Sequence, residues 1–149
     1  MIRDTRQPSS AGPKLLTAKQ GGKLLLVDVA VGTERATLDG SDWQCRYDAQ
    51  SLVLCSTYRR VSGTGIAVFD AASLKKRWAL PDGSGRIVPK VNGFWHGAAY
   101  GQMGDESVVL DGKTGQDCET SPGAAPFEID RYGGLVDRMG PPAFYRATG

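Results

Sequence analysis

The sequence predicts an all-β protein made of consecutive four-stranded antiparallel blades of a β-propeller. A short apolar segment that ends in aspartate occurs three times, at residues 24–28, 66–70 and 107–111. The three aspartates, Asp28, Asp70 and Asp111, are separated by 42 and 41 residues. The 20 glycines and 8 prolines interrupt the chain at short intervals, as expected for many short strands joined by tight turns.

A second set of apolar positions supports the same repeat. Val53, Trp95 and Val136 each follow one of these aspartates by 25 residues. Each lies just after a pair that favours a turn, and these pairs are Gln50 and Ser51, Asn92 and Gly93, and Gly133 and Gly134. Asn-Gly and Gly-Gly pairs supply the positive φ of two-residue hairpin turns, so we expect hairpins there.

One unit read in full predicts four strands in about 41 residues, which is typical of a propeller blade. The expected strands are 86–91, 94–100, 106–111 and 116–120. We expect residues 1–14 to be a flexible N-terminal segment and residues 15–149 to form a partial propeller. Its blades are expected at 15–40, 41–82, 83–123 and 124–149, two of them whole and two partial.

The two terminal blades are predicted to be incomplete. The first is expected to lack its first strand, with strands at 15–20, 23–28 and 34–38. The last is expected to lack its fourth, with strands at 127–132, 135–139 and 143–149. Because such an array does not close comfortably, we expect either a fragment of a longer chain or association between copies.

Residues 66–78, IAVFDAASLKKRW, combine an apolar strand, an Asp-Ala turn and a tryptophan. This segment resembles the repeat of the PQQ-like, or quinoprotein-type, β-propeller family, and the likeness covers roughly residues 15–149. Leu74 stands where the family favours glycine, and Ala36 and Glu119 replace Trp78 in the sister units. The resemblance implies two structural roles. The aspartates Asp28, Asp70 and Asp111 cap turns, and Trp78 packs between adjacent blades.

The sequence contains little catalytic chemistry. His96 is the single histidine, so a metal site built on several histidines has no ligands, and we interpret His96 as a hydrogen-bonded strand residue. Residues 112–114, GKT, lack the first glycine of a phosphate-binding loop, and residues 63–65, GTG, lack the third glycine of a dinucleotide fingerprint. We predict no enzyme activity, no catalytic residue, no bound metal and no cofactor.

Three aromatic residues are candidates for ligand binding. Trp43, Trp95 and His96 could line a groove, whereas packing of one blade on the next is the competing interpretation for large aromatic side chains. The 18 basic and 16 acidic residues are spread along the chain, so we expect no nucleic-acid partner. No apolar run approaches the roughly 20 residues of a membrane-spanning helix, so we expect no integral membrane protein.

The cysteines leave two alternatives open. A three-residue loop formed by Ala49, Gln50 and Ser51 would set Cys45 opposite Cys55 and permit a disulfide, which implies an oxidising compartment. A two-residue loop would point the two side chains to opposite faces. Cys118 is then unpaired, and we expect it to be a small buried residue.

These observations favour a non-catalytic propeller module that acts as a scaffold or binds a protein or a small ligand. The family resemblance implies an extracytoplasmic or cell-surface location, although no signal peptide is visible in this chain. A first alternative is a fragment of a PQQ-dependent dehydrogenase, which would need PQQ and calcium. A second is a small protein that completes its assembly by self-association.

Overall fold

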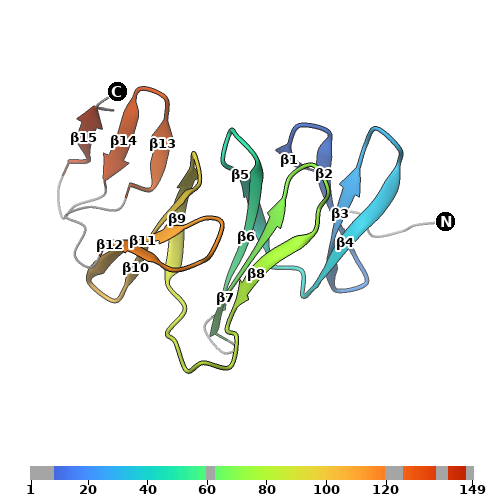
Figure 1. Cartoon of the computed structure of the whole chain (residues 1–149), viewed down its shortest axis with the longest axis horizontal. Helices are drawn as coiled ribbons and strands as arrows, with labels where there is room; N and C mark the ends of the chain where they lie inside the picture. The colour runs from blue at the N-terminus through green and yellow to red at the C-terminus, as the bar shows by residue number, and fades with distance from the viewer. Residues whose placement is uncertain (1–8, 60–62, 120–125, 137–140, 147–149) are drawn as a thin grey trace.

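The computed structural model describes residues 9–59, 63–119, 126–136 and 141–146 and has fifteen β-strands in them. The strands form four antiparallel sheets, and each sheet consists of strands that follow one another in the sequence (Figure 1). The predicted all-β class is confirmed. Within the described ranges, no helix is long and apolar enough to cross a membrane.

Four sheets follow one another along the chain, and we number them in that order. Sheet one has β1 (Ser9–Gly12), β2 (Leu15–Gln20), β3 (Lys23–Asp28) and β4 (Thr33–Asp39). Sheet two has β5 (Gln44–Tyr47), β6 (Leu52–Arg59), β7 (Gly63–Asp70) and β8 (Lys76–Leu80). Sheet three has β9 (Lys90–Trp95), β10 (Ala98–Met103), β11 (Glu106–Asp111) and β12 (Asp117–Glu119). Sheet four has β13 (Glu128–Asp130), β14 (Gly133–Val136) and β15 (Ala143–Arg146).

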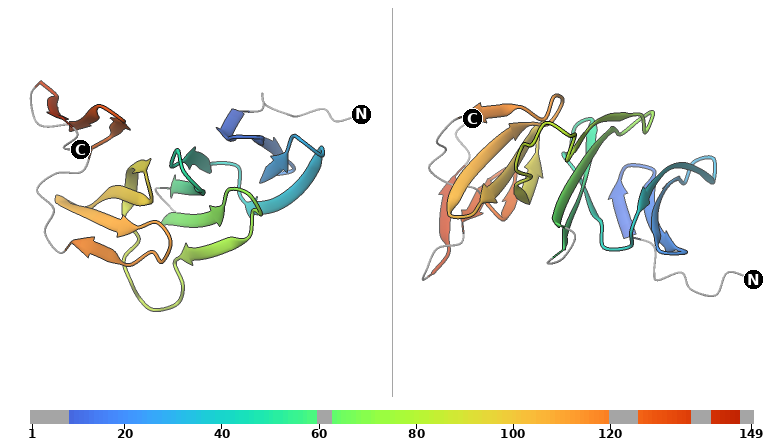
Figure 2. Two further views of the ribbon diagram at one scale, coloured as in Figure 1. Left: turned by 45° about the horizontal axis from the view of Figure 1, so that its top comes forward. Right: turned by 90° about the horizontal axis from the view of Figure 1, so that it is seen from below.

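Sheet two is covered on both faces by its neighbours (Figure 2). Side chains alternate across a strand, so Leu54 points to the core shared with sheet three and Val53 to the core shared with sheet one. β7 repeats this division with Val68 and Phe69. Burial on both faces explains why residues 52–55 and 66–69 are continuously apolar rather than alternating.

The first strands of the four sheets contact one another in succession. β1 contacts β5, β5 contacts β9, and β9 contacts β13. The hairpin turns that follow these first strands lie at one end of the molecule (Figure 1). Residues brought together at that end therefore come from distant parts of the sequence.

The recurring aspartates close the same turn in three sheets. A carboxylate oxygen of each accepts a hydrogen bond from the backbone N–H two residues later, at Ala30, Ala72 and Lys113. Its carbonyl oxygen accepts from the N–H four residues later, at Gly32, Leu74 and Gly115. Those three residues all have positive φ, of 67°, 54° and 74°. The departure from glycine at Leu74 therefore leaves the turn intact.

The predicted turn at Asn92 and Gly93 is wrong. Both residues lie in β9, and the turn is formed by His96 and Gly97, with φ of 45° and 78°. The ladder pairs Tyr100 with Gly93 and the next residue with Val91, which leaves Asn92 as an extra residue in a bulge.

The predicted turn at Gly133 and Gly134 is also wrong, because both glycines lie in β14 and the turn is formed by Arg131 and Tyr132. A Cβ atom at Gly134 would lie 2.8 Å from a Pro126 side-chain atom. One at Gly93 would lie 3.2 Å from the Pro126 carbonyl oxygen. Glycine at position 93 therefore permits close packing of sheet three on the start of sheet four, and glycine at position 134 permits close packing of Pro126 on β14.

The first sheet is more complete than expected. β1 pairs with β2, so the prediction that the first blade lacks its first strand is wrong, and residues 9–12 belong to the sheet rather than to a flexible segment. Residues 1–8 lie outside the described ranges. Among the described residues sheet four has three strands, as predicted, while positions 120, 137–139 and 147–149 of the expected strands are not described.

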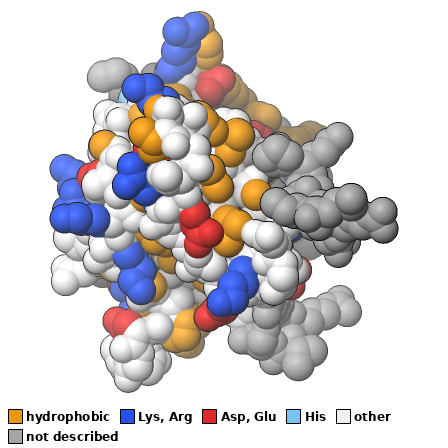
Figure 3. Space-filling model, turned by 90° about the vertical axis from the view of Figure 1, so that its right-hand side faces the viewer, with side chains coloured by type: hydrophobic (Ala, Val, Ile, Leu, Met, Phe, Trp, Pro, Cys, Tyr) orange, Lys and Arg blue, Asp and Glu red, His pale blue; other side chains and the backbone are white. Residues whose placement is uncertain are grey.

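Charges of both signs are interspersed on the outer side of sheet one (Figure 3). Lys23 lies 3.4 Å from Asp39, and Arg35 lies 3.8 Å from Asp28. All four side chains are at least partly exposed, so these pairs contribute little to stability. The two pairs bring charges of opposite sign together on the described part of this sheet.

Candidate functional site

A groove of about 520 Å³ lies between sheets three and four. Its volume is in the range of small-molecule sites. From sheet three it is lined by Trp95, His96 and Tyr100, and from the region of sheet four mainly by Ile129, Asp130, Arg131, Val136, Tyr145 and Arg146. The groove thus combines aromatic surface with charged groups at its border.

Trp95 and His96 form the aromatic surface of the groove. Trp95 ends β9 and is half-buried, whereas His96 lies in the following turn and is exposed. Their rings are stacked, with centroids 4.4 Å apart and planes 10° from parallel. The interpretation of His96 as a strand residue is therefore wrong. The left-handed turn places its ring beside that of Trp95.

Asp48, in the first hairpin turn of sheet two, holds this turn in place. Its carboxylate Oδ2 accepts a hydrogen bond of 3.0 Å from the Gly97 N–H, and its carbonyl oxygen accepts one of 2.8 Å from the His96 N–H. Asp48 is fully buried. The Asp48 contacts join sheets two and three beside the candidate site, at a separation of 49 residues in sequence.

The same carboxylate also closes its own turn. Asp48 Oδ1 accepts the backbone N–H groups of Gln50, Ser51 and Leu52 at 2.9, 2.8 and 2.9 Å. A buried carboxylate is stable when such hydrogen bonds replace its hydration. Sequence reasoning missed Asp48 because its partners His96 and Gly97 are brought to it only by the stacking of the sheets.

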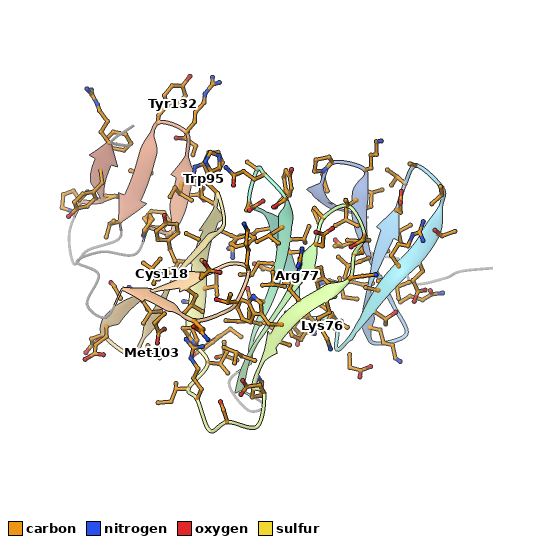
Figure 4. The ribbon with its side chains drawn as sticks, viewed as in Figure 1. Lys76, Arg77, Trp95, Met103, Cys118 and Tyr132 are labelled. Carbon is orange, nitrogen blue, oxygen red and sulfur yellow. A yellow bond between two sulfur atoms is a disulfide. The ribbon has the colours of Figure 1, made fainter. Side chains whose placement is uncertain are left out.

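Sheet four borders the groove with a charged turn. Asp130 Oδ1 accepts hydrogen bonds from the Tyr132 and Gly133 N–H groups at 2.7 and 3.2 Å. The Arg131 guanidinium donates to the Tyr132 hydroxyl at 2.6 Å and lies 4.7 Å from the centre of that ring. Tyr132 and Trp95 lie at the same end of sheets four and three (Figure 4).

Tyr100 and Cys118 belong to the same sheet as Trp95. Partial burial raises the pKa of Tyr100, so its hydroxyl stays protonated at neutral pH. Cys118 is exposed, so the expectation that it is buried is wrong. Partial desolvation and the carboxylates of Asp111 and Asp117 raise the pKa of the Cys118 thiol, which disfavours the reactive thiolate.

Trp43 and Trp78 lie outside the groove. Trp43 packs beside the core between sheets one and two, and its indole N–H donates to the Asp39 carbonyl oxygen at 2.8 Å. Trp78, on β8, packs beside the core between sheets two and three and donates to the Gly112 carbonyl oxygen at 2.8 Å. Of the three predicted binding residues, the structure brings Trp95 and His96 together and leaves Trp43 apart.

Cys45 and Cys55 form a disulfide. Asp48 and Leu52 close a three-residue loop, which sets Cys45 directly opposite Cys55 with their Cα atoms 4.0 Å apart. This is the first of the two alternatives left open by the sequence. The bond therefore fastens the hairpin whose turn carries Asp48.

The described residues include no group of three or more His, Cys, Asp or Glu side chains that could hold a metal ion. A comparison with models of known protein families finds no match to this chain. A comparison with curated proteins also finds no match.

Proposed function

We propose that this chain is a non-catalytic binding module whose sheets are successive blades of a β-propeller, with the groove beside Trp95 and His96 as its binding site. The succession of contacts from β1 to β5, β9 and β13 supports the blade arrangement, because blades pack with their first strands around a common axis. The observation that carries the binding site is the stacked Trp95 and His96 pair, held at the groove by Asp48.

The proposal extends to the compartment. The Cys45–Cys55 disulfide supports an extracytoplasmic location, because such bonds persist in oxidising surroundings. Mass spectrometry of the native protein under non-reducing conditions tests this. We expect one disulfide and one free thiol, at Cys118, and free thiols at Cys45 and Cys55 would contradict the placement.

The three indole N–H signals in a ¹H–¹⁵N NMR spectrum provide a test of the binding site. The Trp43 and Trp78 indoles are hydrogen-bonded away from the groove, so their signals are internal controls for the Trp95 signal. We propose screening soluble saccharides, small organic acids and short peptides. A ligand of the groove should shift the Trp95 signal and leave the other two in place. If none of these classes shifts it selectively, the groove is not the site.

A second candidate function, self-association, is favoured by the outer edge of sheet four. Among the described strands, β15 pairs only with β14, and its Phe144 and Tyr145 side chains are 59% and 43% exposed. An unpaired edge with exposed aromatic residues is suited to pairing with another strand. Sedimentation should then give a dimer that Phe144→Lys dissociates, and a monomer at all concentrations would contradict this candidate.

A further inference from the structure

We infer that the groove between sheets three and four takes an acidic saccharide, a sugar chain that carries carboxylate groups. This inference rests on the proposed binding function and specifies its ligand class. It depends on three properties of the groove: its charge, its aromatic surface and its exposure.

The charged side chains that line the groove favour an anion. Among the described lining residues, Arg131 and Arg146 carry guanidinium groups and Asp130 carries the one carboxylate. Asp130 already accepts two backbone hydrogen bonds within its own turn. Arg131 already donates to the Tyr132 hydroxyl, but a guanidinium has five N–H donors. Guanidinium groups are suited to binding carboxylates because their N–H groups match the two oxygens. The ligand is therefore expected to carry negative charge.

The aromatic surface favours a ring. Stacking covers one face of each ring and leaves an outer face on Trp95 and on His96, and both residues line the groove. A sugar ring has a face of C–H groups that can pack on such a surface, while its hydroxyl groups point outwards. Tyr100 and Tyr145 also line the groove. Partial burial raises the pKa of Tyr100, and its protonated hydroxyl is a hydrogen-bond donor of the kind that binds sugar oxygens.

The exposure of the groove distinguishes a sugar from an aromatic acid. His96, Arg131 and Tyr145 are exposed and Trp95 is only half-buried. A ligand bound here keeps one side in water, which costs little for a hydroxylated ring and more for an apolar aromatic ring. The volume of about 520 Å³ accommodates a short saccharide rather than a small ion.

Trigalacturonate tests the inference, with maltotriose as the neutral saccharide. Titration followed by the indole NMR signals should shift the Trp95 signal with trigalacturonate, with an affinity at least about tenfold higher than for maltotriose. Binding should weaken as salt concentration rises. Arg131→Gln and Arg146→Gln should each lower the affinity by about five- to tenfold, the size of one ordinary hydrogen bond, because both side chains are exposed to water. Arg35→Gln, on β4 of sheet one, is the matched control and should leave it unchanged.

Other outcomes have distinct meanings. Equal binding of maltotriose and trigalacturonate would overturn the acidic class and leave the proposed binding function in place. Preferred binding of indole-3-acetate or of a six-residue oligothymidylate would overturn the saccharide class and would also leave the proposed binding function in place. A failure of every probe to shift the Trp95 signal would count against the proposed function itself. Trp95→Phe, which keeps an aromatic ring but has no indole signal, should weaken binding as measured by titration calorimetry. Thermal denaturation verifies that this variant is folded.

Discussion

The first hairpin turns of sheets two and three lie side by side but satisfy their backbones in different ways. In sheet two, the buried Asp48 carboxylate accepts three N–H groups of its own turn. In sheet three, the N–H groups of His96 and Gly97 are satisfied from outside, by that same Asp48. One turn is thus closed by its own side chain, and the other leaves its side chains available to the groove.

Among the variants that test this difference between the two turns, Asp48→Ala should have the largest effect on stability. The substitution leaves four backbone N–H groups without their carboxylate partner, so we expect a loss of about 3 kcal/mol in the free energy of unfolding. Urea denaturation measures this loss. Asp105→Ala removes an exposed carboxylate from a turn of sheet three and should change stability by less than about 0.5 kcal/mol. Equal effects of the two variants would contradict the role given to Asp48.

Removal of the disulfide should have the next largest effect. The double variant Cys45→Ala, Cys55→Ala opens a loop with a sequence separation of 10, which corresponds to about 2.5 kcal/mol of unfolding free energy. Cys118→Ala, which removes the exposed thiol, is the control and should have little effect. A double variant as stable as the native chain would show that the hairpin of sheet two does not depend on the bond.

Two aspartate turns end in a glycine at the same position, Gly32 in sheet one and Gly115 in sheet three, but the surroundings of the two glycines differ. A Cβ atom at Gly115 would lie 2.7 Å from the Trp78 ring, whereas one at Gly32 would meet nothing within 4 Å. Both residues have positive φ, so alanine is strained at either position. We expect Gly32→Ala to cost about 1 kcal/mol and Gly115→Ala about 2 kcal/mol in thermal or urea denaturation. Similar costs would mean that Trp78 does not pack closely on sheet three.

The part of the fold that the sequence predicted is the part determined by local interactions. The aspartate turns recur because carboxylate, backbone amides and a positive-φ residue all lie within five positions. The disulfide depends on a loop length that the sequence left open between two and three residues. The turn predictions at Gly93 and Gly134 were wrong because both glycines pack closely on Pro126, which is distant from Gly93 in sequence and meets it only once the sheets are stacked. The prediction that Val53 and Trp95 occupy equivalent positions in their repeats is also wrong. The linkers between sheets differ in length, so Val53 lies in the second strand of sheet two and Trp95 in the first strand of sheet three.

The sequence could predict the aromatic residues of the candidate site but not the residues that come from other sheets. Trp95 and His96 could be identified as an aromatic pair, and a glycine after His96 was an available signal for a turn. Asp48 could not be assigned, since a lone aspartate before a turn gives no indication of a partner in another sheet. The contribution of Arg131, Arg146 and Tyr145 was equally hidden, because sheet four reaches the groove only through packing of β13 against β9.

The smallest expected effect concerns pH and the aspartate turns of sheets two and three. Backbone hydrogen bonds, chiefly from Ser73 and Thr114, lower the pKa of Asp70 and Asp111 respectively. A carboxyl group whose pKa is lower in the folded state stabilises the fold above its unfolded pKa, and this contribution is lost as pH falls through the folded value. Stability should therefore decline below about pH 4. Asp70→Asn and Asp111→Asn should each flatten that decline in urea denaturation, and an unchanged slope would contradict the assignment.

Amide hydrogen exchange at His96 and Gly97 reports on the contact between sheets two and three, because both N–H groups bond to Asp48. We expect both to exchange slowly in the native protein, although they lie in a turn at the end of the molecule. In Asp48→Ala, measured where the variant is folded, Gly97 should exchange much faster. The Gly115 amide, bonded to the Asp111 carbonyl oxygen in another turn of sheet three, should change little. Rapid exchange of His96 and Gly97 in the native protein would contradict the proposed role of Asp48.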